Sequence, residues 1–168
     1  MDPDSIGTIL IMLALVGMSA YFSATETAFS TFNRLRLKSL AEDGNKRAAQ
    51  VLKLAEDYDK LLSTILVGNN LVNILLTTVA TLFFADLIVN DEDLAAAVST
   101  LVITVVVLVF GEITPKSLAK QYADSFTMAT VPLLRVVMVL LAPINFIFSL
   151  WKKLLRLLFK TTEDVVTE

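Results

Sequence analysis

The strongest constraint on this chain is the spacing of its basic residues, because it leaves three long apolar segments uninterrupted. No Lys or Arg occurs at positions 1–33 or 61–115. The apolar segments run from about residue 6 to 32, 61 to 89 and 94 to 115. At about 1.5 Å per residue, a helix made from each segment can cross the roughly 30 Å hydrocarbon core of a bilayer. The sequence therefore predicts an all-α membrane protein with three transmembrane helices.

The composition excludes most familiar catalytic chemistry. Hydrophobic residues make up 55% of the 168 residues and the mean hydropathy is +0.70, far from the values of a soluble domain. The chain has no Cys and no His, so it cannot form a disulfide framework, a Cys/His zinc site, a thiol nucleophile or a Ser-His triad. A net charge of −3 gives no basic field for nucleic acid. We therefore expect neither an enzyme nor a nucleic-acid partner.

The clusters of Lys and Arg also predict the orientation in the membrane. Seven of them lie between residues 34 and 60, whereas the connection at 90–93 is acidic. Lys and Arg near the ends of spans are retained on the cytoplasmic side. We expect a multi-pass protein of the cell membrane with its N-terminus outside, the 34–60 segment inside and its C-terminus in the cytoplasm.

A fourth apolar stretch, from residue 125 to 151, has two interpretations. Arg135 lies near its middle, Pro132 and Pro143 interrupt it, and both flanks are basic. We therefore expect residues 120–160 to form a juxtamembrane belt of amphipathic or re-entrant helices in the inner leaflet, with Arg135 snorkelling or paired. The alternative is a fourth span that contains a buried Arg135.

The segment from 34 to 60 is predicted to be a cytoplasmic helical hairpin. Apolar residues recur at helical spacing on both sides of Asp43-Gly44-Asn45, a typical turn sequence. Residues 1–160 then make one transmembrane domain. The polar residues 161–168 are expected to be a linker to a cytosolic domain that is absent from this sequence.

Polar residues inside the predicted spans are the candidates for function. Glu26 and Glu112 lie deep, with no basic residue in the same spans, and an ionisable group is costly in a bilayer. Depths counted from the basic anchors place three polar clusters in the inner half or the middle of the membrane, where they can meet. These clusters are Ser23, Thr27 and Ser30 with Glu26; Asn69, Asn70 and Asn73; and Gly111 to Lys116.

Pro115 frees a main-chain carbonyl, that of Gly111, which can act as a further ligand. Its ring excludes the helical hydrogen bond to the carbonyl of Gly111, and a bare carbonyl at membrane depth needs a protein group, water or an ion. The resulting set contains only oxygen ligands, which is typical of a hard cation such as Mg²⁺, Ca²⁺ or Na⁺. The alternative is structural, because Ser, Thr and Asn in membrane helices often bond to their own backbone or to a neighbouring helix. Glu26 has the same alternative.

Three motifs together resemble the signature segments of the DUF21 transmembrane domain of the CNNM/CorC magnesium transporters. They read Ser-Ala-Thr-Glu26-Thr27-Ala-Phe-Ser30, Gly68-Asn69-Asn70-Leu-Val-Asn73-Ile and Phe-Gly111-Glu112-Ile-Thr-Pro115-Lys116. The resemblance extends over residues 5 to 155 or so. It implies a homodimer with three spans per subunit, a juxtamembrane helical belt, and Na⁺-dependent export of Mg²⁺ from the cytoplasm.

Carried onto this sequence, the resemblance implies a Mg²⁺ site formed by Ser23, Asn70, Asn73, the Gly111 carbonyl and Glu112. Pro115 would create a kink, and the candidates for lining the site or binding Na⁺ are Glu26, Thr27, Ser30 and Asn69. Full-length members of this family continue into a cytosolic pair of CBS domains that bind ATP. Because this sequence stops at Glu168, we expect this chain to lack nucleotide regulation.

Two other functions remain open beside exchange of Na⁺ for Mg²⁺. The domain would act as a membrane sensor or regulatory module if it bound Mg²⁺ without moving it, and as a divalent-cation channel if flux were indifferent to Na⁺. An intramembrane enzyme is the weakest hypothesis, because the polar residues supply acids and hydroxyls but no activated nucleophile.

Overall fold

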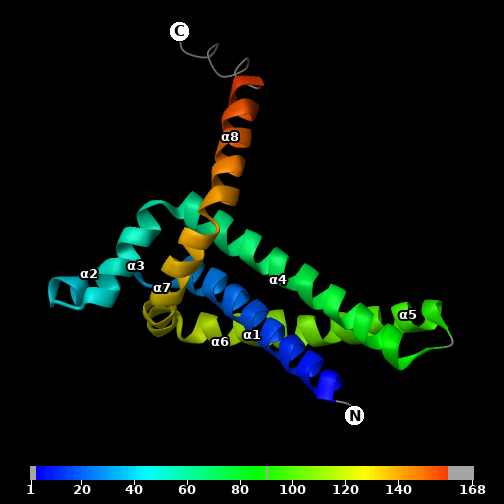
Figure 1. Ribbon diagram of the computed structural model, residues 1–168. Helices are drawn as coiled ribbons and strands as arrows, with labels where there is room; N and C mark the ends of the chain where they lie inside the picture. Colours follow the sequence, from blue (N-terminus) through cyan, green and yellow to red (C-terminus); the bar gives the residue numbers. More distant parts are fainter. Residues whose placement is uncertain (1–2, 90, 159–168) are drawn as a thin grey trace, which may run out of the picture.

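The computed structural model describes residues 3–89 and 91–158, and nearly all of them are helical (Figure 1). No strand occurs within these ranges, so the expectation of an all-α fold is confirmed. The predicted linker at 161–168 lies outside the described residues. In chain order the elements are α1 (Pro3–Thr31), α2 (Arg34–Glu42), α3 (Lys46–Glu56), α4 (Tyr58–Leu87), α5 (Glu92–Val106), the π-helix η1 (Val107–Ile113), α6 (Thr114–Gln121), α7 (Ala123–Leu140) and α8 (Ala142–Leu158).

Four helical segments are long and apolar enough to cross a membrane by length and composition. They are Ser5–Thr31, Tyr58–Leu87, Glu92–Gln121 and Ala123–Leu140. The third is a continuous rod made of α5, η1 and α6. Large apolar side chains such as Leu10, Leu82 and Leu101 are exposed along these segments, where lipid rather than water would cover them. The chain is therefore a multi-pass membrane protein.

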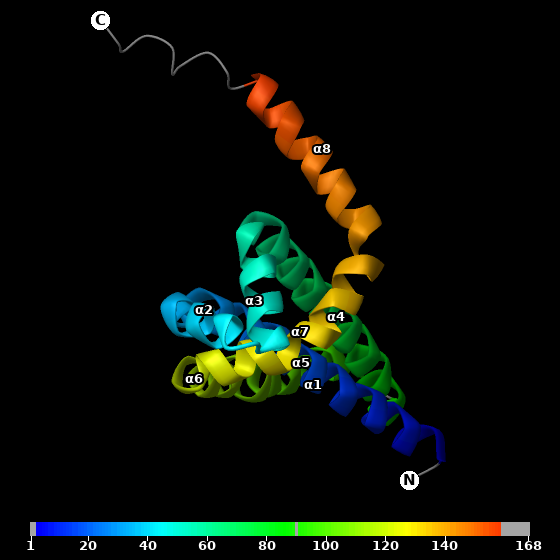
Figure 2. The same ribbon diagram turned by 90° about the vertical axis from the view of Figure 1, so that its left-hand side faces the viewer.

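The long helices α1, α4 and the α5–α6 rod form the main bundle (Figure 1). Helix α1 is its centre, because it contacts α4, η1, α6 and α7. Helices α2 and α3 lie at one end of this bundle, which we call the hairpin end. Figures 1 and 2 both show α7 running across the hairpin end, not alongside the long helices, and α8 projecting away from it.

The apolar core lies at the hairpin end. Phe22 and Phe29 of α1 are buried there with Leu61 of α4, Val51 of α3 and Leu134 of α7. On another side of α1, small residues allow close packing against α6. These residues are Ala24, Ala28 and Ala119, which form a separate buried cluster. The packing therefore fixes the position of α6, and of the π-helix that precedes it, relative to α1.

Local capping explains the shape of the hairpin. Asn33 caps α2 by accepting a hydrogen bond from the N–H of Arg36, and Asn45 caps α3 by accepting from Arg47 and Ala48. Gly44, between the two helices, has a φ of 92°, which glycine adopts without the steric cost that other residues meet. Turn chemistry of this kind is sufficient to end one helix and begin the next.

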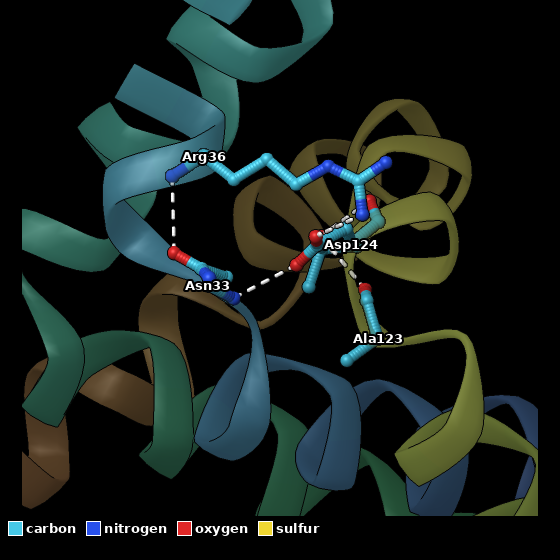
Figure 3. Close-up of polar contacts among 5 residues, drawn as sticks. Asn33, Arg36, Ala123 and Asp124 are labelled. Atoms are coloured by element: carbon cyan, nitrogen blue, oxygen red, sulfur yellow. Dashed lines mark hydrogen bonds and ion pairs between the residues drawn. The ribbon is translucent and has the colours of Figure 1, made fainter. Parts of the chain in front are cut away.

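Asp124, at the start of α7, fastens the hairpin to the bundle (Figure 3). Its Oδ1 accepts a 2.8 Å hydrogen bond from the backbone N–H of Asn33, and its Oδ2 lies 3.3 Å from Nη1 of Arg36. The Asp124 side chain is 16% exposed and that of Arg36 is 70% exposed. Both contacts are exposed, but one ties the Asp124 carboxylate to the backbone and the other ties it to an exposed side chain.

We expect Asp124→Ala to lower the free energy of unfolding by about 1 to 2 kcal/mol, because it removes a charged acceptor from the Asn33 N–H. Arg36→Gln, which removes only the exposed ion pair, should cost less than about 1 kcal/mol. Thermal unfolding in detergent micelles measures both effects. Equal losses in the two variants would show that the ion pair, and not the backbone hydrogen bond, holds the junction.

Candidate functional site

Three helices meet at Ser19, in the middle of α1. Its hydroxyl donates a 3.3 Å hydrogen bond to Oδ1 of Asn69 on α4. A Cβ atom built on Gly111, in η1, would lie 3.0 Å from the Ser19 Oγ. Gly111 is buried, so a side chain there would fill the space between η1 and α1. Ser19 of α1, Asn69 of α4 and the main chain of η1 at Gly111 therefore come together at one level of the bundle.

Gly68 explains how α1 and α4 approach so closely. A Cβ atom at this position would lie 2.5 Å from Cζ of Phe22, a distance that real Cβ contacts do not show. The Phe22 ring is 3% exposed and fills the place that a side chain at 68 would need. The glycine before Asn69 therefore lets the tip of the Phe22 ring approach the backbone of α4, and Ser19 lies within hydrogen-bond distance of Asn69.

The π-helix η1 precedes Pro115 in the third rod. Thr114 donates its N–H to the carbonyl of Val109, five residues earlier, which is the π pattern. Pro115 has no N–H, so it cannot donate to the carbonyl of Gly111 as a regular α-helix would require. Short π segments within α-helices are frequent at functional sites. Here the irregular main chain lies beside Ser19, inside the bundle.

The predicted hydroxyl and amide ligands fall into two groups. Thr27 donates to the carbonyl of Ser23 at 3.1 Å, and Ser30 donates to that of Glu26 at 2.8 Å, as the structural alternative expects. By contrast, the buried Ser23 Oγ and the buried Asn73 Oδ1 have no hydrogen-bond partner within the described residues. A buried polar atom without a partner is costly. These two oxygens therefore have capacity for a ligand.

Asn70 and Asn73 lie at one end of a wide, open depression of 530 Å³ along a single face of α4. The rest of this face is formed by Ile74, Thr77, Thr78, Thr81 and Leu82. Asn70 is exposed in this depression, whereas Glu112 is half-buried on η1. Among the described residues, 3–89 and 91–158, no hydrogen bond or ion pair joins Glu112 to Asn70 or Asn73. Ser19, Asn69 and Gly111 therefore form one group, and Asn70 and Asn73 form a second. No hydrogen bond or ion pair among the described residues connects Glu112 to either group.

Glu26 has a partner that the sequence did not indicate. Its Oε2 lies 3.3 Å from Nζ of Lys116 on α6, and the two side chains are 29% and 42% exposed. No basic residue lies within the predicted spans, and the base that pairs with Glu26 comes from just beyond the third of them. Lys116 lies beyond the third predicted span in the sequence, but its long side chain reaches α1 because Ala24, Ala28 and Ala119 pack the two helices closely.

Sequence reasoning also missed Ser19. It lies one helical turn before Ser23 and is fully buried, so the i, i+4 spacing of the two serines was a signal that could have found it. Because Ser19 is not next to either acidic residue in the sequence, it was not included among the candidate site residues. Ser19 donates the hydrogen bond that orients Asn69. Its Oγ also lies so close to Gly111 that a Cβ atom there would be 3.0 Å away.

The site carries little formal charge. Among the residues that the structure describes, no group of three or more acidic side chains gathers in a way that could hold a metal ion. The ligands predicted from the sequence are hydroxyl and amide oxygens, the Gly111 carbonyl and the Glu112 carboxylate. Such a set suits a hard cation, and its low charge favours exchange over permanent retention.

Comparison with known proteins identifies the family to which this chain belongs. Residues 10–168 match the family described as the cyclin M transmembrane N-terminal domain. The chain is 37% identical to the UPF0053 inner membrane protein YfjD of Escherichia coli strain K12, over 89% of this chain and 34% of that protein. It is 36% identical to a UPF0053 protein of Haemophilus influenzae, over 91% of this chain and 36% of that one.

A further relative has a name that describes an activity. The chain is 26% identical to the polyamine export protein of Haemophilus influenzae, over 84% of this chain and 35% of that protein. The chain spans about a third of the length of these curated relatives. Features shared with them therefore concern this membrane domain.

Proposed function

We propose that this chain, which belongs to the family of the cyclin M transmembrane N-terminal domain, binds Mg²⁺ from the cytoplasm and exports it in exchange for Na⁺. One observation carries the proposal. Ser23 Oγ and Asn73 Oδ1 are buried and unpartnered among the described residues, and each residue lies one helical turn from a member of the contact between Ser19 and Asn69. A cation would supply the missing partner of each oxygen.

The proposed orientation has three spans and an in-plane belt. The spans are α1, α4 and the α5–α6 rod, with the hairpin end in the cytoplasm, as the positive-inside rule predicts. Helix α7 has 18 residues and contains Pro132, and it runs across the bundle in both views. These features support an interfacial helix over a fourth crossing. We also propose a homodimer in the cell membrane, as the family resemblance implies.

The proposed Mg²⁺ ligands are Ser23, Asn70, Asn73, the Gly111 carbonyl and Glu112. Mg²⁺ prefers six oxygen ligands in near-octahedral geometry and loses its water reluctantly. Neutral oxygens and a single carboxylate would complete its coordination together with retained waters. The residues Ser19 and Asn69 would hold the helices in register around the ion, because their hydrogen bond joins α1 to α4.

The ion pair between Glu26 and Lys116 lies on the hairpin side of this site, further along α1 and the third rod. We propose that the pair narrows the cytoplasmic entrance and that Na⁺ competes with the Lys116 ammonium for the Glu26 carboxylate. Thr27 directs its hydrogen to the backbone carbonyl of Ser23, which leaves lone pairs of its oxygen available to Na⁺. Ser30 donates to the carbonyl of Glu26 and its oxygen also lies 3.0 Å from the Tyr58 hydroxyl, so Na⁺ would share this oxygen with Tyr58. Asn69 is the remaining candidate for lining the path.

A second candidate function is export of an organic polycation. The relative named polyamine export protein raises it, and the ion pair of Glu26 gives it a physical basis. An alkylammonium group, that of Lys116, already lies 3.3 Å from the Glu26 carboxylate. The ammonium group of a polyamine has the same chemistry and could replace it.

The test is Mg²⁺ efflux from proteoliposomes that contain this chain, with and without an opposing Na⁺ gradient. We expect efflux that requires Na⁺ and is unaffected by spermidine. Efflux that is indifferent to Na⁺ would overturn exchange in favour of a channel, and binding without efflux would favour a sensor module. Movement of labelled spermidine in place of Mg²⁺ would establish the second candidate.

A further inference from the structure

A groove lies between α3 and α7, outside the ion site. It has a volume of 740 Å³, and its lining includes Arg47 and Gln50 of α3 and Pro132, Arg135 and Val139 of α7. Two guanidinium groups from different helices therefore face one space. No acidic side chain lines it.

The two guanidinium groups lack counter-ions. In the described part of the chain, neither the Arg47 nor the Arg135 side chain has an ion pair or a hydrogen bond, whereas Arg36 nearby is paired with Asp124. Arg cannot lose its charge in a protein, and its planar fork suits a phosphate or carboxylate. An anion from outside the chain is therefore the fitting partner.

The remaining wall of the groove is apolar and exposed. Pro132, Arg135, Val136 and Val139 share one face of α7 at helical spacing, with Val136 55% exposed and Val139 74% exposed. Exposed valines beside an uncompensated arginine are typical of a helix that lies at a lipid headgroup layer. The ligand that fits this groove therefore has an anionic headgroup and apolar chains.

We propose that this groove binds one anionic phospholipid of the cytoplasmic leaflet. The guanidinium groups of Arg47 and Arg135 hold the headgroup phosphate, and the acyl chains extend along Val136 and Val139. The proposal uses the membrane orientation given above but none of the ion ligands. Loss of Mg²⁺ transport would therefore leave it intact, and failure of lipid binding would leave the transport proposal intact.

Native mass spectrometry of the full chain in detergent tests this binding, with phosphatidylglycerol and phosphatidylcholine added at equal concentration. We expect the wild type to retain phosphatidylglycerol preferentially. Arg47→Gln and Arg135→Gln should each lower this preference about fivefold, which corresponds to about 1 kcal/mol for one basic residue at a membrane surface. If Arg135→Gln reduces the helical content, Arg47→Gln on the opposite wall still decides the result.

Arg34→Gln is the matched control, because it removes the same charge from the hairpin end at a residue that does not line the groove. It should leave the preference unchanged. An equal fall in the control, or equal retention of both lipids by the wild type, overturns the proposal. So does complete displacement of the lipid by soluble glycerophosphate, or a shift between monomer and dimer in the groove variants, which would assign the groove to a second copy of the chain.

Discussion

Replacing Glu112 with glutamine is expected to reduce Na⁺-driven Mg²⁺ efflux at least about tenfold. The amide keeps the shape of the side chain but removes the carboxylate of the residue next to Gly111, and a tenfold weaker binding corresponds to about 1.4 kcal/mol. Hard cations depend strongly on charged oxygen ligands when few are present. The measurement is efflux from proteoliposomes at equal protein density, with the melting temperature of each variant determined in parallel.

The matched control is Glu92→Gln, which removes the same charge from the first turn of α5, at the opposite end of the rod from α6. Its efflux should equal that of the wild type.

Asn73→Leu tests whether Asn73 acts as a ligand or has a structural role, because its Oδ1 has no hydrogen-bond partner to lose within the described residues. We expect reduced efflux with an unchanged melting temperature. Full efflux from Glu112→Gln would eliminate this carboxylate as a ligand.

Replacing Gly68 with alanine is expected to destabilise the bundle by about 1 to 3 kcal/mol, the usual cost of overpacking a core. The new Cβ would lie 2.5 Å from the Phe22 ring, which is buried and has little room to move. Separation of α1 from α4 would also weaken the hydrogen bond between Ser19 and Asn69. Thermal unfolding in detergent should show a lower midpoint, and Mg²⁺ efflux should fall with it.

Gly17→Ala provides the control for this substitution, since a Cβ there meets no atom within 4 Å. It should be neutral or slightly stabilising, because alanine favours a helix over glycine by about 1 kcal/mol. Adding Phe22→Leu to Gly68→Ala should restore part of the lost stability by making room for the new methyl group. A midpoint for Gly68→Ala equal to that of Gly17→Ala would show that the two helices are not held by this contact.

The sequence was sufficient to predict a helical membrane protein, because segments such as 61–89 are too long and too apolar for other folds. The number of spans was not accessible in the same way. By length and hydropathy α7 is a candidate span like the three long helices, although Figures 1 and 2 show it running across the hairpin end of the bundle. That difference depends on tertiary packing at Leu134 and on the junction held by Asp124.

The candidate site shows the same limit. Polar residues inside apolar segments can be recognised one by one, which is how Ser23, Asn73 and Glu112 were chosen, and their role as ligands remains a prediction. Contacts between helices depend on rotation and register, which no single segment encodes. The approach of Lys116 to Glu26 and of Ser19 to Asn69 therefore became visible only in the structure.

The π-helix has a consequence for how the third rod can move. One π turn accommodates a surplus residue compared with an α-helical turn. If that surplus residue passes from one side of Gly111 to the other, the side chains between the two positions rotate by about 100° around the rod, the angle that one residue occupies in an α-helix. Such a rotation would carry Glu112 toward a different neighbour while α5 and α6 keep their packing. The rod can thus reorient one carboxylate without sliding in the membrane.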